Sequence, residues 1–287
     1  MAILLVMLFF FLACTPDPNP DTVEDVDTGL DGAVPTTNLE AVWSVQEMSE
    51  ELSAFLEAGF PGPRQMIGVF EDVFAEGDDF CPGGDNWLKS AKLGCASESG
   101  WWYSGIGGYW YTAKTDDYSS FETFVQFGDM EILGTEGRRL AVGGHWIHDL
   151  RHFDDRSEWF GELNGSWNSA DFGLDWLDAG TSAWLEYTGI RFGDDDLLGF
   201  AGVRGGLAIG DQAVHFDDFQ LTGEGCAGIF PAGTLSILDP SGGWYRLTYP
   251  GDCTVCGTLT FSGEVVEDAF CFAPDALRQT MSDALSR

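Results

Sequence analysis

The chain has few basic residues and no hydrophobic run long enough to span a membrane. Its 287 residues include 13 Lys and Arg against 47 Asp and Glu, which gives a formal charge of −34. Because nucleic-acid binding depends on basic side chains that contact phosphates, we expect no nucleic-acid partner. The uncharged apolar run from Met1 to Ala13 is shorter than the roughly 20 residues that a bilayer core requires.

Common catalytic and nucleotide-binding motifs are also missing. No serine has glycine two residues away on both sides, and none of the three lysines follows a glycine, which excludes a hydrolase elbow and a P-loop. Gly223–Gly228 has the glycine spacing of a dinucleotide site, but Pro231 and Gly233 would stop the helix that holds the pyrophosphate. The sequence therefore favours a binding or structural role over catalysis, although a convergent active site needs no motif.

The first residues are typical of an export signal. Residues 1–13 have the length and polarity of the apolar h-region of an export signal, and Phe11-Leu12-Ala13-Cys14 resembles the lipobox of bacterial lipoproteins. This resemblance covers the signal alone and implies cleavage before Cys14, whose sulfur and new amine are then acylated. An ordinary cleaved signal peptide is the alternative. In that family Asp directly after the cysteine favours the inner membrane, so Thr15 implies lipid anchoring at the outer membrane or cell surface.

Residues 14–40 are predicted to be the acylated cysteine and an acidic disordered tether. They contain no basic residue and are rich in Asp, Pro, Thr and Gly, a composition that buries too little apolar surface to fold alone. Residues 41–98 are predicted to hold a helical pair and a disulfide loop. Apolar residues recur there at three- and four-residue steps within 45–56 and 66–74, which is the helical period.

Residues 99–287 are predicted to form an antiparallel β-meander or sandwich closed by a short helix. Aromatic and β-branched runs alternate there with Gly and Asp. The predicted strands are 101–103, 109–111, 121–127, 130–133, 140–147, 157–160, 183–187, 199–203, 214–221, 234–238 and 244–249. Turn residues predict one hairpin through Ser104–Gly108 and another through Asp239–Gly243. Apolar residues at four-residue steps after Pro274 predict the C-terminal helix, so the fold class is mainly β.

The cysteines other than Cys14 are even in number, which favours disulfides in an exported chain. Cys81 and Cys95 are expected to pair, because they stand apart from the rest. Three pairings stay open for the remaining four, which are Cys226, Cys253, Cys256 and Cys271. Zinc binding or a redox-active pair through the closely spaced Cys253 and Cys256 is the less favoured alternative, since a second close pair is missing.

Three of the four histidines lie close together in the sequence. His145, His148 and His152 precede Asp154, and histidines and a carboxylate at such spacing can bind a metal ion. The plainer interpretation is a polar strand end whose histidines contact nearby carboxylates. We therefore expect no cofactor and no zinc, whereas acidic loops such as Asp194–Asp196 are compatible with weak calcium binding.

Aromatic residues give the best indication of a ligand. Alternation along a strand would put rings on both faces of a sheet, and a face left open would offer flat rings to a sugar. A second layer covering that face is the alternative. The candidate platform consists of Trp101, Trp102, Tyr103, Tyr109, Trp110 and Tyr111.

These features predict a membrane-anchored lipoprotein of the cell envelope with a disulfide-braced β domain that binds a ligand or serves a structural role. The alternatives are a carbohydrate-binding or carbohydrate-active surface protein, and a metal-dependent module that uses the histidine cluster. The expected partners are the membrane, through the lipid, and a polysaccharide or another envelope protein. The strong negative charge favours a neutral or cationic partner over an anionic one.

Overall fold

The computed structural model describes the folded part of the chain. The described residues are 39–58, 61–74, 81–84, 88–115, 120–192, 197–223, 226 and 229–272. The predicted signal peptide, Cys14, nearly all of the predicted tether and the predicted C-terminal helix lie outside them. Within these ranges, no helix has the length and apolar character needed to cross a membrane.

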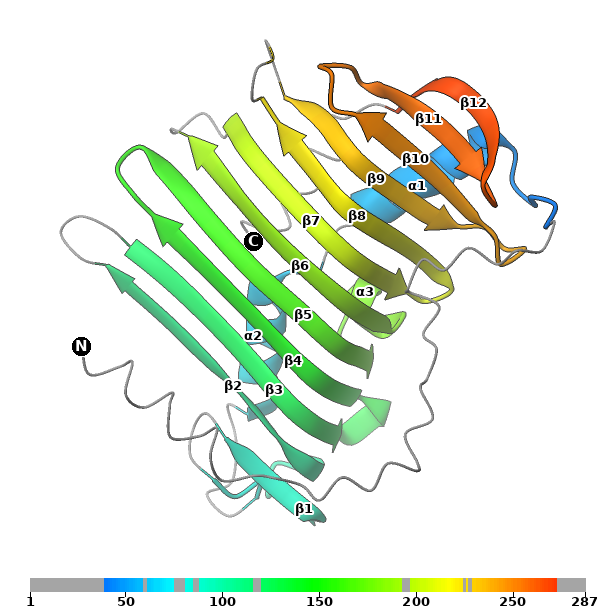
Figure 1. Cartoon of the computed structure of the whole chain (residues 1–287). Helices are drawn as coiled ribbons and strands as arrows, with labels where there is room; N and C mark the ends of the chain where they lie inside the picture. The colour runs from blue at the N-terminus through cyan, green and yellow to red at the C-terminus, as the bar shows by residue number, and fades with distance from the viewer. Residues whose placement is uncertain are drawn as a thin grey trace, which may run out of the picture.

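In the described part of the chain, twelve antiparallel strands form one sheet (Figure 1). Each strand pairs with its neighbour in the sequence, from β1 to β12. The strands are β1 Lys89–Ala96, β2 Trp102–Thr115, β3 Ser120–Leu133, β4 Arg139–His152, β5 Arg156–Ala170, β6 Thr181–Phe192, β7 Leu197–Ile209, β8 Gln212–Thr222, β9 Phe230–Leu238, β10 Trp244–Pro250, β11 Cys256–Phe261 and β12 Glu264–Cys271. The predicted mainly β fold is confirmed, and its form is the meander rather than the sandwich.

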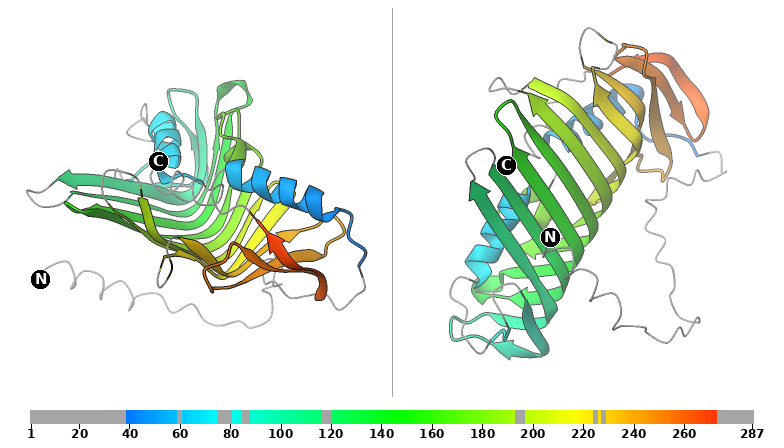
Figure 2. Two further views of the ribbon diagram at one scale, coloured as in Figure 1. Left: turned by 90° about the horizontal axis from the view of Figure 1, so that it is seen from above. Right: turned by 60° about the vertical axis from the view of Figure 1, so that its left-hand side comes forward.

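The sheet is bent into a trough, and two helices lie on its concave side (Figure 2). They are α1, Val45–Ala58, and α2, Pro63–Phe74, and they confirm the predicted helical pair. Ser44 and Glu47 cap the start of α1 reciprocally: the Ser44 amide donates to Oε2 of Glu47 at 2.8 Å, and the Glu47 amide donates to Oγ of Ser44 at 3.3 Å. In α2, the Phe70 ring stacks on Tyr109 of β2 with centroids 4.8 Å apart.

The core lies between these helices and the concave face. Strand side chains alternate between the two faces, so between Leu140 and Leu150 every second residue of β4 except Gly144 is buried, including Trp146. The Trp146 ring meets the edges of three other rings, with centroids at 5.5 Å for Phe124, 5.8 Å for Trp167 and 6.1 Å for Trp176. The short helix α3, Asp175–Asp178, brings Trp176 into this cluster.

Glycines on β5 and β6 make room for rings on the concave face. Tyr187 of β6 lies directly opposite Gly161, and a Cβ on Gly161 would lie 2.0 Å from Cζ of Tyr187. Trp159 of β5 lies opposite Gly189, where a Cβ would lie 2.2 Å from Cζ2 of the indole. Each ring therefore crosses the neighbouring strand at a residue without a side chain, which closes the core between β5 and β6.

The predicted hairpin through Ser104–Gly108 is wrong, because β2 runs through this segment without a shift in its register to β3. Gly105 has φ +96°, and a Cβ there would lie 2.2 Å from the carbonyl oxygen of Asp129. Gly107 lies against the side chain of Met130. These glycines permit a twist and close packing inside a strand rather than a turn. Similarly, 121–127 and 130–133 belong to the single strand β3.

The predicted hairpin through Asp239–Gly243 is confirmed and joins β9 to β10. Asp239 also holds the start of α1, because its carboxylate accepts hydrogen bonds from the amides of Val42 at 3.1 Å and Trp43 at 2.9 Å. Burial alone would raise the pKa of Asp239, but hydrogen bonds from Ser241, Trp43 and Val42 outweigh it and lower the pKa. The first helix is thus tied to the ninth and tenth strands.

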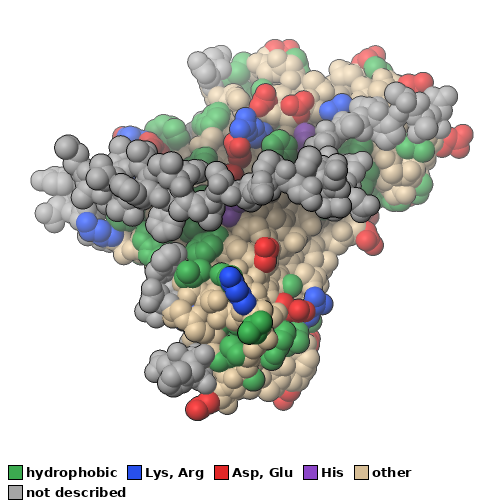
Figure 3. Space-filling model, turned by 60° about the horizontal axis from the view of Figure 1, so that its bottom comes forward, with side chains coloured by type: hydrophobic (Ala, Val, Ile, Leu, Met, Phe, Trp, Pro, Cys, Tyr) green, Lys and Arg blue, Asp and Glu red, His purple; other side chains and the backbone are tan. Residues whose placement is uncertain are grey.

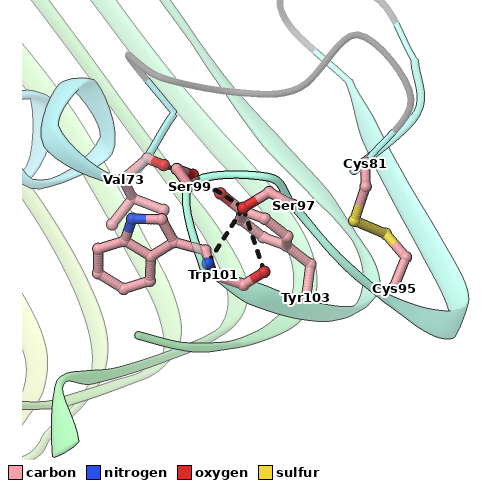
Figure 4. Close-up of a disulfide and its surroundings, with 7 residues drawn as sticks. All are labelled: Val73, Cys81, Cys95, Ser97, Ser99, Trp101 and Tyr103. Carbon is pink, nitrogen blue, oxygen red and sulfur yellow. Dashed lines mark hydrogen bonds between the residues drawn. A yellow bond between two sulfur atoms is a disulfide. The ribbon is translucent and has the colours of Figure 1, made fainter. Parts of the chain in front are cut away.

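Three disulfides brace the two ends of the sheet. Cys81 and Cys95 pair as predicted, beside the end of β1 (Figure 4). The pairing that the sequence left open is Cys226 with Cys253 and Cys256 with Cys271. The close pair Cys253 and Cys256 is therefore divided between two disulfides, and neither zinc ligation nor a Cys253–Cys256 disulfide describes these residues.

Candidate functional site

The six rings of the predicted platform do not share one face. Tyr103 is buried on the concave side and donates a hydrogen bond from its hydroxyl to the carbonyl oxygen of Val73 at 3.0 Å (Figure 4). Tyr109 stacks on α2, and Trp101 packs against Phe172. These three rings therefore belong to the core.

The remaining three rings of the set are more exposed but lie apart. Trp102 and Trp110 are 37% and 46% exposed on the convex face, and seven residues of β2 separate them. Tyr111 donates a hydrogen bond from its hydroxyl to Glu122 at 3.3 Å. Glu122 also accepts a hydrogen bond from Arg64 Nε at 3.1 Å. Three rings of the predicted platform thus pack in the core, and the other three are exposed at separate places.

The histidines of the predicted metal site all lie on β4 but face different surroundings. His145 Nε2 lies 2.9 Å from Glu162 on the convex face, and His152 Nδ1 lies 2.9 Å from Oγ of Ser157. Asp154 follows in the exposed turn after β4. Among the described residues, no group of three or more His, Cys, Asp and Glu side chains is placed to hold a metal ion. Of these contacts, the one between His145 and Glu162 is the carboxylate contact that the plainer interpretation predicts, whereas His152 contacts a serine hydroxyl.

His148 is the buried member of this group. Its Nδ1 lies 2.9 Å from the hydroxyl of Tyr187, the ring that crosses β5 at Gly161. Burial lowers the pKa of His148 to about 4, since the charged imidazole would lose its hydration. Burial also raises the pKa of Tyr187. Both side chains are therefore neutral near pH 7 and serve the core.

A groove on the convex face was not predicted from the sequence. Phe160, Thr188, Gly202 and Gln220 lie directly opposite one another on β5, β6, β7 and β8. Thr188 has a short side chain and Gly202 has none, so the surface is hollow between the longer residues at either end. This first hollow has a volume of about 340 Å³. On this face hydrophobic side chains are exposed among acidic and basic ones (Figure 3).

The two walls of the first hollow differ in chemistry. Phe200 forms the apolar wall, and Glu186 and Arg204 form the charged wall. Arg204 donates from Nε and Nη2 to the two carboxylate oxygens of Glu186, both at 2.9 Å. The hydrogen bonds to Glu186 raise the pKa of Arg204. This planar pair presents hydrogen-bonding edges in a defined orientation, next to Asp218 and Gln220 at the end of the hollow.

A second hollow of about 380 Å³ lies on the other side of Phe160. Phe160 and Thr188 line both hollows, and the Phe160 side chain is 45% exposed between them. Four charged or aliphatic side chains line the second hollow but not the first, namely those of Asp149, Arg151, Glu158 and Ile190. Oδ1 of Asp149 accepts a hydrogen bond from the Thr123 hydroxyl at 2.6 Å, which holds this carboxylate in place.

The charges of the groove disfavour an anionic ligand. The lining of the two hollows contains four carboxylates, Asp149, Glu158, Glu186 and Asp218, against the two guanidinium groups of Arg151 and Arg204, a net charge of −2. The chain as a whole carries −34. An anion would therefore meet a repulsive local and overall field, whereas a neutral ligand would not.

The sequence contained a weak signal for this site. Phe160 and Phe200 occupy positions at which alternation places polar residues, and Gly202 follows within the same predicted strand. The register that brings them together could not be read from one sequence. Comparison with known protein families, curated proteins and solved structures found no match for the chain. The chemistry of the groove is therefore the basis for a functional proposal.

Proposed function

We propose that this protein is an exported, lipid-anchored component of the cell envelope that binds a neutral glycan in the groove of its convex face. The observation that supports this proposal most strongly is the exposed Phe160 ring between two hollows, beside the paired Glu186 and Arg204. The lipobox resemblance at Cys14 supports the anchor. The three disulfides are consistent with an oxidising compartment outside the cytoplasm.

A sugar ring matches the two kinds of wall. Its C–H face packs against an aromatic ring, for which Phe160 and Phe200 are available, while its hydroxyls both donate and accept hydrogen bonds. Glu186 and Gln220 offer acceptors, and Arg204 offers donors. A ligand that is apolar on one side and hydroxylated around its rim satisfies both walls without carrying charge.

The proposed role is recognition rather than cleavage. Glycoside hydrolysis requires two carboxyl groups in different environments that flank the scissile bond. In the groove, Glu186 makes a two-bond contact with Arg204, and Asp149 is bound by Thr123. These contacts hold the two carboxylates in fixed orientations, which suits them to binding hydroxyl groups.

A glycan array tests this function. The full chain, purified in a detergent without a sugar headgroup, is applied to neutral and charged polysaccharides, and each bound polysaccharide is assayed for new reducing ends. We expect binding to a neutral glycan and no release of reducing ends. Phe160→Ala should weaken that binding by roughly tenfold or more, because it removes the shared ring.

The matched control is Trp110→Ala, because Trp110 is 46% exposed on the same face but lies on β2, outside the groove. This variant should bind the glycan as the unaltered chain does. Failure to bind every neutral glycan would contradict the proposal, as would equal binding by the Phe160→Ala variant. Release of reducing ends would replace recognition with catalysis.

A further inference from the structure

We propose that the convex groove binds an oligosaccharide laid across the strands, with the Phe160 ring separating two subsites. This inference rests on the proposed function, because it assumes that the ligand is a neutral glycan. It adds the form of the ligand, a chain rather than a single sugar, and the direction in which the chain lies.

The register of the sheet gives the direction of the groove. Asp149, Phe160, Thr188, Gly202 and Gln220 form one row of opposite residues from β4 to β8. Four spacings between neighbouring strands, each about 4.8 Å, give the row a length of about 19 Å. This length exceeds a single hexose ring, and both hollows lie along it.

The two walls of the first hollow exclude a ligand that lies along the strands. Phe200 lies two positions from Gly202 on β7, and Arg204 lies two positions away on the opposite side. Both side chains line the first hollow, so a ligand that ran along the strands would collide with one of them. A ligand that crosses the strands passes between them, over the short side chain of Thr188 and past the edge of the Phe200 ring, which lies over Gly202.

Each hollow has its own set of binding groups. The first has Glu186, Arg204 and Gln220, and the second has Arg151 and Glu158. Each set combines a guanidinium group with a carboxylate, which together can donate to and accept from hydroxyl groups. The Phe160 ring is common to both hollows, so neighbouring sugar units can pack against either side of it. The repetition of donor, acceptor and ring suits a repeating ligand.

Calorimetric titration of the full chain with neutral oligosaccharides tests the two subsites. The probes are the cello-, malto-, laminari-, manno- and xylo-oligosaccharide series, each from the monosaccharide to the hexasaccharide, in a detergent without a sugar headgroup. We expect the affinity for one series to rise by roughly tenfold or more between the disaccharide and the tetrasaccharide, as the second hollow is filled.

Two variants assign that rise to the two hollows. Arg151→Ala, in the second hollow alone, should weaken binding of the tetrasaccharide but not of the disaccharide. Arg204→Ala, in the first hollow alone, should weaken binding of both. Glu158→Gln provides a second probe of the Arg151 side that keeps the size of the residue, and Trp110→Ala should change neither affinity.

The possible failures are distinguishable. If no oligosaccharide of any length binds, the proposed function fails and the two-subsite inference fails with it. If a sugar binds but the affinity is the same for the monosaccharide and the hexasaccharide, glycan binding stands and the two subsites are wrong. The same conclusion follows if Arg151→Ala and Glu158→Gln both leave the affinity for the longer chain unchanged.

Discussion

On the concave face of the sheet Trp146 and Trp167 are 0% and 1% exposed, whereas on the convex face of the same sheet Phe160 and Trp184 are 45% and 50% exposed. The concave rings pack against one another, and α1 and α2 lie on this side of the sheet (Figure 2). The convex rings stand among charged residues such as Glu186 and Arg204. One strand thus supplies large side chains to a core and to an open surface at alternate positions.

Glycines sharpen this contrast between the faces. On the concave face the space beside Gly161 and beside Gly189 is filled by the ring of the residue opposite. On the convex face Gly202 is only partly covered, because the Phe200 ring approaches its missing Cβ to 3.1 Å and a hollow remains beside it. Glycine thus lets an opposite ring complete the core on the concave face and contributes to a hollow on the convex face.

Crowding the concave face at Gly161 should cost more stability than any of the changes considered below. Gly161→Ala would place a methyl group 2.0 Å from Cζ of Tyr187, and the ring must leave its position over β5. We expect the free energy of unfolding to fall by about 3 kcal/mol, because overpacking and the lost contact between His148 and Tyr187 add together. Chemical denaturation of the purified protein measures this change.

The control for this prediction is Gly68→Ala on α2. Apart from its chain neighbours and the nearby backbone of α2, no atom lies within 4 Å of a Cβ at Gly68, and the residue is exposed. Alanine there should leave stability unchanged or raise it by about 0.5–1 kcal/mol through the helix propensity of alanine. An equal loss of stability in both variants would show that the ring over Gly161 is not the cause.

The buried His148 on the concave face should make the stability of the protein depend on pH. Burial lowers the pKa of His148 to about 4, against roughly 6.5 in an unfolded chain. The stability that depends on neutral His148 is fully present above pH 6.5 and is lost as the pH falls towards 4, because the unfolded chain then binds a proton that the folded chain excludes. Measuring the free energy of unfolding between pH 7 and 4.5 should reveal this contribution.

His148→Gln isolates that contribution, since glutamine does not titrate. The variant should lose less stability than the unaltered chain over the same interval, by about 2–3 kcal/mol. Its hydrogen-bonding side chain can still reach the hydroxyl of Tyr187. Parallel pH profiles for the two proteins would contradict the assignment of this pH dependence to His148.

The smallest effect is expected on the convex face. Phe160→Ala and Trp184→Ala remove rings that are half exposed, so each should change the free energy of unfolding by about 0.5 kcal/mol or less. Thermal unfolding followed by circular dichroism measures this change. A loss comparable to that of Gly161→Ala would mean that these rings support the fold, and the contrast between the two faces would then be wrong.

Much of the fold could be predicted, because its helices and turns follow from residue patterns that are local in the sequence. The apolar steps of α1 and α2 and the turn at Asp239–Gly243 predict the observed elements. The isolation of Cys81 and Cys95 predicts their disulfide. Glycine caused the main error, since Gly105 adopts a positive φ and Gly107 packs closely against Met130 inside a strand instead of forming a turn.

The candidate site could not be predicted, because it depends on register. Phe160, Thr188 and Gly202 are 28 and 14 residues apart in the sequence and become neighbours only when three strands are aligned. The prediction of a ring platform at Trp101–Tyr111 failed for a related reason. Alternation correctly indicated that these rings would face both sides, but it could not tell that α2 covers Tyr103 and Tyr109.

The contact between Asp239 and the start of α1 constrains the order in which the fold assembles. Each strand pairs with the strand before it, so the sheet can grow along the chain through local contacts. Val42 and Trp43, however, reach their partner 197 and 196 residues later. The first helix therefore reaches its final place only after the β9–β10 hairpin exists. In a chain truncated before this hairpin, α1 lacks the Asp239 carboxylate that holds its start.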